Sequence, residues 1–388
     1  MIKVLQLVGG GEAIGGVEKM LLSYYSFMDR EKVCFDFCFY RKSTVEADQN
    51  VTNGLLSMSQ VFDLRAFENT GVFSGYVRSI KRVAEIIKNN GYDIVHINAG
   101  RPPLLICGLI SAKKAGVKKI IIHSHSTKGV SNRSTITDFV YRMMSLALQS
   151  VFRRNATILA GCSKEAAQFM FGKSVTSTSK YMPIRNAIVV NPFLFNKGLR
   201  QQVREEMQAD EKTLVVGHVG SFSTPKNHLF LIDVYYEIKK RIPNSKLWLA
   251  GNGNLKEGAE QYAKDLGLQN DVLFLGERKD ANRLYQGMDM MVFPSLWEGL
   301  SVSIVEAQAA SLPVFASSNI SPEHKITNKL RFVDLSKGAE FWAEYIIKEM
   351  QNEVNRKDMT DQITQRGYNI EVEAAALQNT YIKMINVN

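Results

Sequence analysis

Residues 290–309 have the sequence MMVFPSLWEGLSVSIVEAQA, which predicts a strand, a loop and a helix in succession. The apolar run 290–293 has the length of a buried strand. Pro294 and Gly299 interrupt it, and a helical pattern begins around residues 301–303. Strand, turn and helix recur in this order along the whole chain. Such alternation is typical of a parallel sheet that helices cover on both faces.

The same pattern divides the chain into two similar halves. Predicted strands of the first half are 4–8, 33–39, 94–97, 120–123 and 157–161, and those of the second are 214–219, 246–250, 272–275, 290–293 and 313–316. We therefore expect an α/β protein with two doubly wound, Rossmann-like domains, an N-terminal domain at 1–190 and a C-terminal domain at 213–366. A linker is expected at 191–212, and a last helix at 367–388 that returns to the N-terminal domain. Ligands of such folds bind beyond the carboxyl ends of the strands, so a substrate cleft between facing domains is predicted.

Composition excludes several classes of protein. The chain has 388 residues, 45% of them hydrophobic and 22% charged, which is the profile of a folded protein and not of a disordered one. Its 4 Cys residues are scattered, without the spacing of a disulfide framework or a paired zinc site. Neither a signal peptide nor an apolar run of membrane-spanning length occurs, so we expect a cytoplasmic protein.

The positive charge is concentrated in one region. The formal net charge is +10, and residues 101–200 contain 16 Lys or Arg against two acidic residues, Asp138 and Glu165. This excess fits either a solvated surface or a face for anionic lipid on the inner side of the cell membrane. Residues 139–154 mix aromatic, aliphatic and basic side chains as an interfacial helix does, although a buried helix with a basic end fits equally well. No nucleic-acid-binding motif appears, so nucleic acid is not an expected partner.

A nicotinamide-dependent enzyme is disfavoured by the glycine-containing turns. In the turns at 9–14 and 251–256, the third small residue of the dinucleotide fingerprint is replaced by Ile14 and Lys256.

The segment 290–309 also carries the predicted chemistry. A helix that begins beyond a strand end presents free backbone N–H groups and a positive dipole, which suit a diphosphate. Glu298 lies in the preceding loop and Glu306 about one turn into the helix. Carboxylates accept hydrogen bonds from sugar hydroxyls, so the pair would hold sugar rings on either side of the anion. Taken alone, the two residues fit solvated surface charges better than a sugar-binding pair.

The setting of the two glutamates resembles retaining GT-B glycosyltransferases of family four, in particular the EpsF-like exopolysaccharide and capsule enzymes. The resemblance rests on the Glu, seven-residue gap, Glu motif, and it extends over nearly the whole chain through GGVE at 15–18, IHSHS at 122–126, GHVGSF at 217–222, KNH at 226–228, LAGNG at 249–253 and FLG at 274–276. It implies a GT-B fold, in which an N-terminal acceptor-binding domain and a C-terminal nucleotide-sugar-binding domain, both Rossmann-like, face each other across a cleft. It also implies a nucleotide-diphosphate sugar as donor, with a UDP-sugar favoured.

The resemblance also implies roles for single residues. Glu306 would bind the ribose, Glu298 the donor-sugar hydroxyls, and Lys226 would neutralise the diphosphate as the glycosidic bond breaks. The implied catalytic residues are Lys226, Glu298 and His125. The implied donor-binding residues are Gly15, Gly16, Ser221, Lys226, Asn252, Gly276, Glu298, Gly299, Leu300, Ser301 and Glu306, and the implied acceptor-binding residues are His96, Asn98 and His123. No Asp-x-Asp motif suggests a metal site, so neither a metal nor a cofactor is expected.

One position departs from the family pattern. The family usually has an arginine five residues before the phosphate-binding lysine, where this chain has Ser221. A hydroxyl brings neither charge nor a bidentate fork.

The predicted function is retaining transfer of a sugar to a lipid-linked or oligosaccharide acceptor in bacterial surface polysaccharide biosynthesis. The alternatives are a catalytically impaired partner subunit that binds nucleotide or glycan, which Ser221 suggests, and a nucleotide-sugar epimerase of the same fold.

Overall fold

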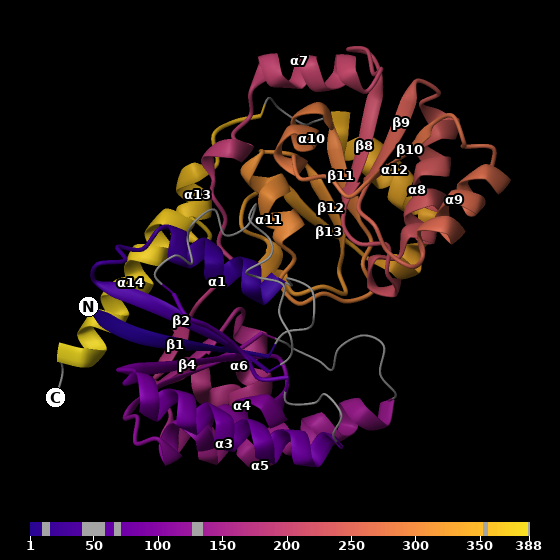
Figure 1. Ribbon diagram of the computed structural model, residues 1–388. Coiled ribbons are helices and arrows are strands. Elements are labelled where there is room, and N and C mark those ends of the chain that lie inside the picture. The colour runs from indigo at the N-terminus through magenta and orange to yellow at the C-terminus, as the bar shows by residue number, and fades with distance from the viewer. Residues whose placement is uncertain (10–15, 41–58, 66–70, 126–134, 352–355, 387–388) are drawn as a thin grey trace. The chain divides into compact units, whose positions relative to one another are not determined.

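The computed structural model describes residues 1–9, 16–40, 59–65, 71–125, 135–351 and 356–386. The chain forms two compact units, one of residues 1–187 with 370–388 and the other of residues 188–369. Each unit contains one parallel sheet with helices packed on it (Figure 1). The prediction of an α/β fold with two doubly wound parallel sheets is thereby confirmed.

The first unit is built on a sheet with strand order β3-β2-β1-β4-β5-β6-β7, in which all neighbours are parallel. Its strands are β1 (Ile2–Val8), β2 (Val33–Phe39), β3 (Val61–Asp63), β4 (Ile94–Ala99), β5 (Lys119–Ser124), β6 (Ile158–Gly161) and β7 (Tyr181–Pro183). Its helices are α1 (Gly16–Ser26), α3 (Val72–Asn90), α4 (Pro102–Lys114), α5 (Thr135–Asn155), α6 (Lys164–Phe171), a short 3₁₀ turn at Lys173–Ser177, and α14 (Ile370–Asn386).

The second unit has the strand order β10-β9-β8-β11-β12-β13, again parallel. Its strands are β8 (Leu214–Val219), β9 (Ser245–Ala250), β10 (Val272–Gly276), β11 (Met290–Phe293), β12 (Val314–Ser317) and β13 (Leu330–Val333). Its helices are α7 (Lys197–Glu206), α8 (His228–Arg241), α9 (Lys256–Asp265), α10 (Ala281–Gly287), α11 (Val302–Ala309), α12 (Gly338–Gln351) and α13 (Thr360–Gln365), with 3₁₀ turns at Asn191–Phe193, Thr224–Lys226, Pro322–His324 and Leu335–Lys337.

Both sheets reverse their strand order at one point, which decides where a ligand can bind. The reversal lies between β1 and β4 in the first unit and between β8 and β11 in the second. In open parallel sheets, the crevice for a ligand lies beyond the carboxyl ends of the strands at such a point. A functional site is therefore expected at the loops that follow these strands.

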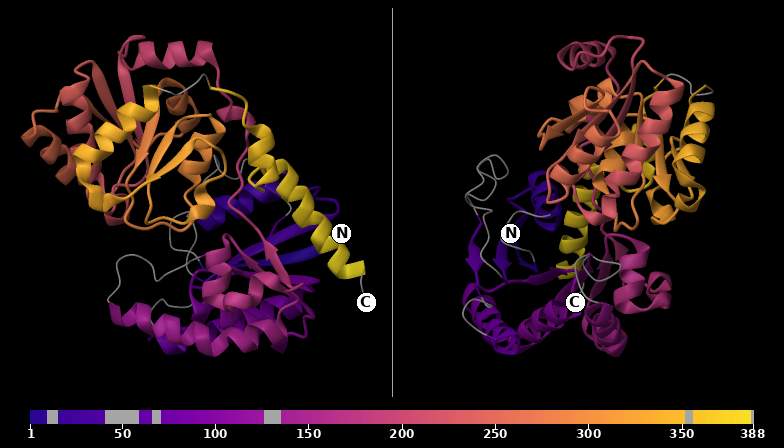
Figure 2. Two further views of the ribbon diagram at one scale, coloured as in Figure 1. Left: turned by 180° about the vertical axis from the view of Figure 1, so that it is seen from behind. Right: turned by 90° about the vertical axis from the view of Figure 1, so that its right-hand side faces the viewer.

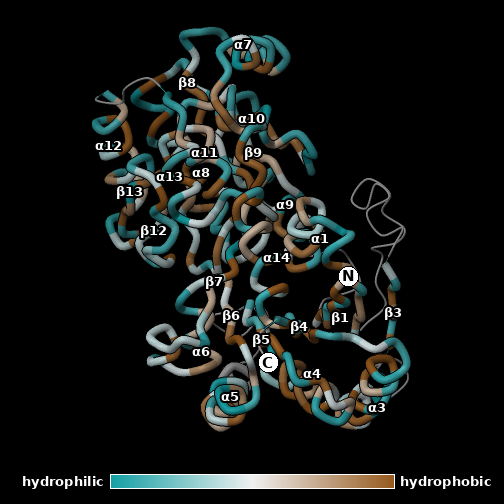
Figure 3. The backbone as a smooth tube through the Cα atoms, turned by 90° about the vertical axis from the view of Figure 1, so that its left-hand side faces the viewer, coloured by the Kyte–Doolittle hydropathy of each residue, from teal (hydrophilic) through white to brown (hydrophobic). Residues whose placement is uncertain are grey.

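Burial explains why these residues form central strands. Strands covered on both faces are nearly continuous apolar runs, and every residue of β2 and β4 is buried. In Figure 3, hydrophobic residues follow the strands, whereas α7 on the outside is largely hydrophilic. Strands that the sequence does not predict are β3, β7 and β13, which have 3, 3 and 4 residues and lie at sheet edges, where the burial pattern is incomplete.

The C-terminal helix α14 belongs to the first unit, although it follows the second in the chain. It contacts α1 and β2 (Figures 1 and 2). Gln378 on α14 accepts a hydrogen bond from the Asp29 backbone N–H at 2.6 Å, and the Tyr381 ring packs edge-on against Phe35 with centroids 5.8 Å apart.

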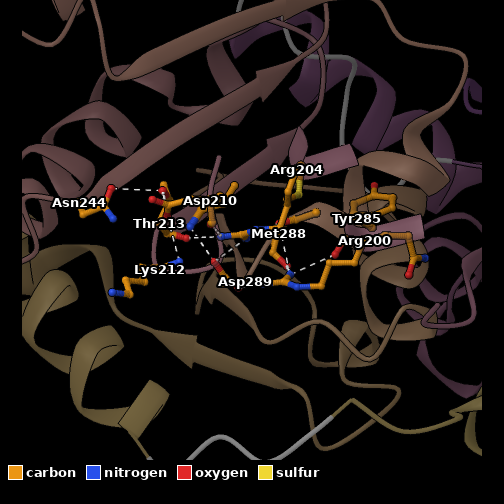
Figure 4. A network of polar contacts seen from close by, with 12 residues as sticks. Arg200, Arg204, Asp210, Lys212, Thr213, Asn244, Tyr285, Met288 and Asp289 are labelled. Carbon is orange, nitrogen blue, oxygen red and sulfur yellow. Dashed lines mark hydrogen bonds and ion pairs between the residues drawn. The ribbon is translucent and has the colours of Figure 1, made fainter. Parts of the chain in front are cut away.

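Residues 191–212 are part of the second unit and not a free linker, which corrects the sequence-based boundary. Arg200 and Arg204, both on α7, form ion pairs with Asp289 at 2.6 and 3.2 Å (Figure 4). Arg204 also donates to the carbonyl of Gly287 at 2.8 Å and to those of Asp210 and Thr213. The polar composition that suggests a linker in fact supplies the guanidinium groups that attach α7 to the start of β11.

Candidate functional site

The loops that follow β8, β9 and β10 lie against one another through backbone hydrogen bonds. Gly220 N donates to Ala250 O at 2.9 Å, and Gly251 N donates to Gly276 O at 2.7 Å. Gly251 has a φ of 148°, and a Cβ there would lie 2.0 Å from the Gly220 carbonyl oxygen. Only glycine permits this approach. The predicted donor-binding residues Ser221, Asn252 and Gly276 are therefore brought to one edge of the second sheet.

Lys226 and Glu298 meet directly in the structure. The loops after β8 and β11 are joined by the Leu296 backbone N–H, which donates to Pro225 O at 2.8 Å. Lys226 Nζ then lies 2.7 Å from Glu298 Oε1, and the two side chains are only 14% and 12% exposed. Ser295 Oγ donates to the same carboxylate oxygen at 2.9 Å. Lys226 also lies over the Phe293 ring, 4.6 Å from its centroid.

The start of α11 differs from the predicted anion site in one respect. Gly299 is exposed, but Leu300 and Ser301 are buried. The Ser301 backbone N–H donates to Nε2 of the buried His324 at 2.9 Å, and Nδ1 of that ring lies 2.9 Å from Ser321 O. The Ser301 amide is thus already engaged. An anion at this end of α11 would rely on the other first-turn amides and on Lys226.

Glu306 is fixed by a side chain that the sequence motifs do not indicate. The Tyr285 hydroxyl donates to Glu306 Oε2 at 2.9 Å, and Tyr285 is fully buried. Burial is the main reason that the pKa of Tyr285 is raised, with the Glu306 carboxylate a further cause. The hydroxyl therefore stays protonated and orients the carboxylate.

In the first unit, His125 follows β5 and its backbone N–H donates to Ala99 O at 3.4 Å. Its side chain is half-buried, and Nε2 lies 3.2 Å from Asn98 Oδ1. Burial lowers the pKa of His125 to about 3. At neutral pH the ring is uncharged, so it offers hydrogen bonds and not a positive charge.

The predicted acceptor-binding residues His96, Asn98 and His123 lie side by side on β4 and β5 and are all buried. The His123 ring lies 3.9 Å from that of His125 and 5.5 Å from that of His96, measured between centroids. The structure therefore brings these residues together beneath His125. Their burial favours support of that side chain over direct contact with an acceptor.

Two other predicted donor-binding residues, Gly16 and Ser221, are exposed. Gly16 begins α1 and is exposed, with open space around the position of a Cβ, whereas Gly15 lies outside the described residues. Ser221 is exposed, and its Oγ lies 3.1 Å from Ser223 Oγ. The two hydroxyls supply no positive charge where relatives of the resembled family have an arginine.

No group of three or more His, Cys, Asp or Glu side chains in the described part of the chain is arranged to hold a metal ion. None of the helices in that part is long and apolar enough to cross a membrane.

Comparison with known proteins assigns the family. The family of glycosyl transferases group 1 matches residues 200–367. Over 388 aligned residues, the chain is 31% identical to the glycosyltransferase-family protein EpsF of Bacillus subtilis (strain 168), covering 98% of this chain and 96% of EpsF. The chain belongs to the group 1 glycosyltransferases. Among solved structures, the GT-B-like fold of this glycosyltransferase matches that of Anabaena HepE, which was solved with UDP and glucose. The TM-score is 0.68 and the sequence identity 19%, and the match covers 100% of this chain and 97% of HepE.

A second relative has a fully specified activity in its name. It is the UDP-Gal:α-D-GlcNAc-diphosphoundecaprenol α-1,3-galactosyltransferase of Escherichia coli, 26% identical over 249 residues, which are 62% of this glycosyltransferase and 62% of the relative.

Sequence reasoning missed the residues that hold the functional side chains in place. These residues are Tyr285, His324 and Tyr381, and none of them is a sequence neighbour of the group it contacts. Tyr381 lies 375 residues from its partner Gln6. No local spacing signals such pairs. They follow only from the order of the strands and from the return of α14 to the first unit.

Proposed function

We propose that this glycosyltransferase transfers a sugar from a UDP-sugar to a lipid-linked or oligosaccharide acceptor, with retention of the anomeric configuration, in bacterial surface polysaccharide biosynthesis. The observation that supports it most is the Lys226–Glu298 pair beside the start of α11, with Glu306 held by Tyr285 one turn further on. A cation, a helix N-terminus and two carboxylates match the diphosphate, the sugar hydroxyls and the ribose of such a donor.

The proposed reaction needs no protein nucleophile. The acceptor hydroxyl attacks the anomeric carbon from the side of the leaving group, the bond from that carbon to the phosphate oxygen breaks, and the hydroxyl proton passes to a diphosphate oxygen. Lys226 would stabilise the charge that develops on the departing UDP. Metal independence is part of the proposal, and EDTA is expected to leave turnover unchanged.

The relatives guide the choice of substrates. The Escherichia coli relative is named for a UDP-sugar donor and a diphosphoundecaprenol-linked acceptor, and HepE was solved with UDP. The test incubates the purified protein with UDP-glucose, UDP-galactose or their N-acetylated forms and a bacterial lipid extract, and it follows UDP release and glycolipid mass. UDP release that requires the acceptor, with a product of the donor's anomeric configuration, supports the proposal. Donor conversion without acceptor would indicate an epimerase, and binding without turnover would indicate an impaired partner subunit.

We further propose that the first unit docks on the inner membrane face through α5. Phe139, Val140, Met143 and Leu146 are exposed on this helix, with Phe139 64% exposed. Their spacing places them along one side of the helix, and Arg142 and Arg154 are exposed on the same helix. An apolar stripe with arginines suits an anionic bilayer.

A vesicle sedimentation assay tests this docking. Vesicles containing phosphatidylglycerol should bind the protein, salt should weaken binding, and Phe139→Ser with Met143→Ser should reduce it. Leu229→Ser, on an exposed apolar residue of α8 in the second unit, is the matched control. Equal loss in the control, or no binding by the unaltered protein, would contradict the proposal.

A further inference from the structure

A continuous series of hydrogen bonds in the first unit joins the C-terminal helix to His125. His125 Nε2 lies 3.2 Å from Asn98 Oδ1, and Asn98 Nδ2 donates to Gln6 Oε1 at 2.9 Å. Gln6 Nε2 donates to the Tyr381 hydroxyl oxygen at 3.3 Å, and this oxygen lies 2.8 Å from His96 Nδ1. All these side chains except that of His125 are buried.

The direction of the hydrogen bonds is determined at Asn98. Besides Gln6, Asn98 Nδ2 donates to the backbone carbonyl oxygen of His96 at 3.2 Å. A carbonyl can only accept, so the amide nitrogen must face that side and Oδ1 must face His125. The side-chain oxygen Oδ1 of Asn98 is likewise only an acceptor. His125 Nε2 must therefore carry the proton.

The same logic continues to the other end of the series. Because Gln6 Oε1 accepts from Asn98, its amide nitrogen faces Tyr381 and donates to the hydroxyl oxygen. A hydroxyl has one proton, which is then left for His96 Nδ1. Every group thus has a defined donor and acceptor side, from Tyr381 on α14 to His125 after β5.

The series requires uncharged rings, and burial supplies this condition. Burial lowers the pKa of His96 to about 3, with a smaller effect from His125, and lowers that of His125 to about 3 as well. Burial is also the main reason that the pKa of His123, whose ring contacts both of the others, lies well below its ordinary value. A neutral His125 protonated on Nε2 has its lone pair on Nδ1.

We propose that Tyr381 is a positioning residue that, through Gln6 and Asn98, holds His125 in the Nε2-protonated form and so presents Nδ1 to the substrate as a hydrogen-bond acceptor. The statement about substrate rests on the proposed function, since it takes His125 as a group that lines the site. The tautomer itself does not depend on that function.

This assignment specifies the chemistry of the group that His125 contacts. A neutral acceptor nitrogen pairs with a hydrogen-bond donor, such as a sugar hydroxyl or the N–H of an acetamido group. An ionised phosphate or carboxylate has no proton to donate and is repelled by the lone pair. The assigned tautomer therefore suits the sugar contact that the family resemblance already implies for His125, and it does not suit a contact with the diphosphate.

The test reads the tautomer by NMR. The full chain, labelled with ¹⁵N-histidine, has 6 His residues, and a His125→Gln variant assigns the signal of interest. Long-range ¹H–¹⁵N spectra at pH 7.5 should show His125 neutral and protonated on Nε2. Tyr381→Phe should change the tautomer ratio by about fivefold towards Nδ1–H, the change expected for loss of one ordinary hydrogen bond. Gln6→Met interrupts the series at another point and should act in the same direction.

Tyr40→Phe is the matched control, because Tyr40 is a buried tyrosine of the same unit whose hydroxyl donates to Leu104 O at 3.2 Å, outside the series. It should leave the His125 spectrum unchanged. A wild-type His125 that is protonated on Nδ1 or doubly protonated would overturn the proposal, as would unchanged spectra in both Tyr381→Phe and Gln6→Met.

A kinetic measurement separates this role from general stabilisation. Tyr381→Phe should lower kcat for transfer while UDP raises the melting temperature as in the wild type, because the proposed UDP contacts lie in the second unit. Loss of kcat together with loss of the UDP-induced rise in melting temperature would overturn the positioning role. If the wild-type protein transfers no sugar, the proposed function fails, while the NMR result still decides the tautomer.

Discussion

Lys226 Nζ and Glu298 Oε1 lie 2.7 Å apart in a setting where both side chains are largely buried. A diphosphate that binds to Lys226 must therefore share or replace the carboxylate as its partner. The free protein holds the ammonium group in place through Glu298, and the donor would exchange one anionic partner for another. In this account Glu298 competes with the diphosphate for Lys226 but helps to bind the donor sugar.

Glu298→Gln separates these two effects. Removing the carboxylate charge leaves Lys226 free for phosphate, so UDP should bind about as tightly as to the wild type or several-fold more tightly. Transfer should fall sharply, because an ionised carboxylate accepts stronger hydrogen bonds from sugar hydroxyls than an amide does. Calorimetry with UDP and initial-rate measurements with a UDP-sugar check the two parts. Loss of UDP binding, or unimpaired transfer, would refute the assignment.

Tyr285→Phe tests how Glu306 is held. Without the hydroxyl, the Glu306 carboxylate loses a partly buried hydrogen bond of 2.9 Å that helps to orient it. Hydrogen bonds to charged groups contribute about 1.5–3 kcal/mol, so UDP affinity should fall roughly tenfold or more. Tyr235→Phe is the control, since this buried tyrosine of the same unit donates to Ser245 O at 2.8 Å. Equal affinities for the two variants would argue against the role of Tyr285.

Ser221→Arg tests the departure from the family pattern. A guanidinium at this exposed position can pair bidentately with phosphate oxygens. UDP should bind several-fold more tightly, and the gain should shrink at high salt. Ser223→Arg places the same charge two residues away and should give a smaller gain. An equal gain in the two variants would reflect net charge and not a specific site.

His228 is one of several buried histidines whose lowered pKa makes the stability of the protein depend on pH. Burial lowers the pKa of His228 to about 4, with a smaller effect from the Lys226 charge, against about 6.5 in an unfolded chain. Between these values the unfolded chain binds more protons at His228, so the contribution of His228 to the free energy of unfolding is fully present above pH 6.5 and falls as the pH drops towards 4. His228→Phe preserves the stacking on Phe222, whose ring centroid lies 4.0 Å away. Urea unfolding at pH 7.5 and 5.0 should show a smaller loss in the variant, and an identical loss would contradict the assignment.

The central strands were predictable because both of their faces are buried. Segments such as residues 214–219 and 290–293 are short apolar runs followed by glycine or proline, and they form β8 and β11 with those bounds. The edge strand β13 escaped prediction because Arg331 interrupts an already short run. The polar segment 197–206 was misassigned to a linker, since its arginines pair with Asp289, which lies 89 residues beyond Arg200.

For the site, the sequence indicated the residues on strand-end loops but not their partners. Lys226, Glu298 and Glu306 stand out by their spacing within a resembled motif. Engagement of the Ser301 amide by His324 was not foreseeable, because this contact arises from the turn after β12. Long-range contacts of this kind depend on tertiary structure and leave no local pattern.

Titration of UDP into the wild-type protein and into Lys226→Met, followed by calorimetry, tests the central claim most directly. If Lys226 holds the diphosphate of the donor, the wild type binds UDP in a 1:1 ratio, and the variant binds it about tenfold to a hundredfold more weakly, as expected for loss of a charge-assisted hydrogen bond. Absence of UDP binding by a folded wild-type protein, or equal affinity of the two proteins, would contradict the account.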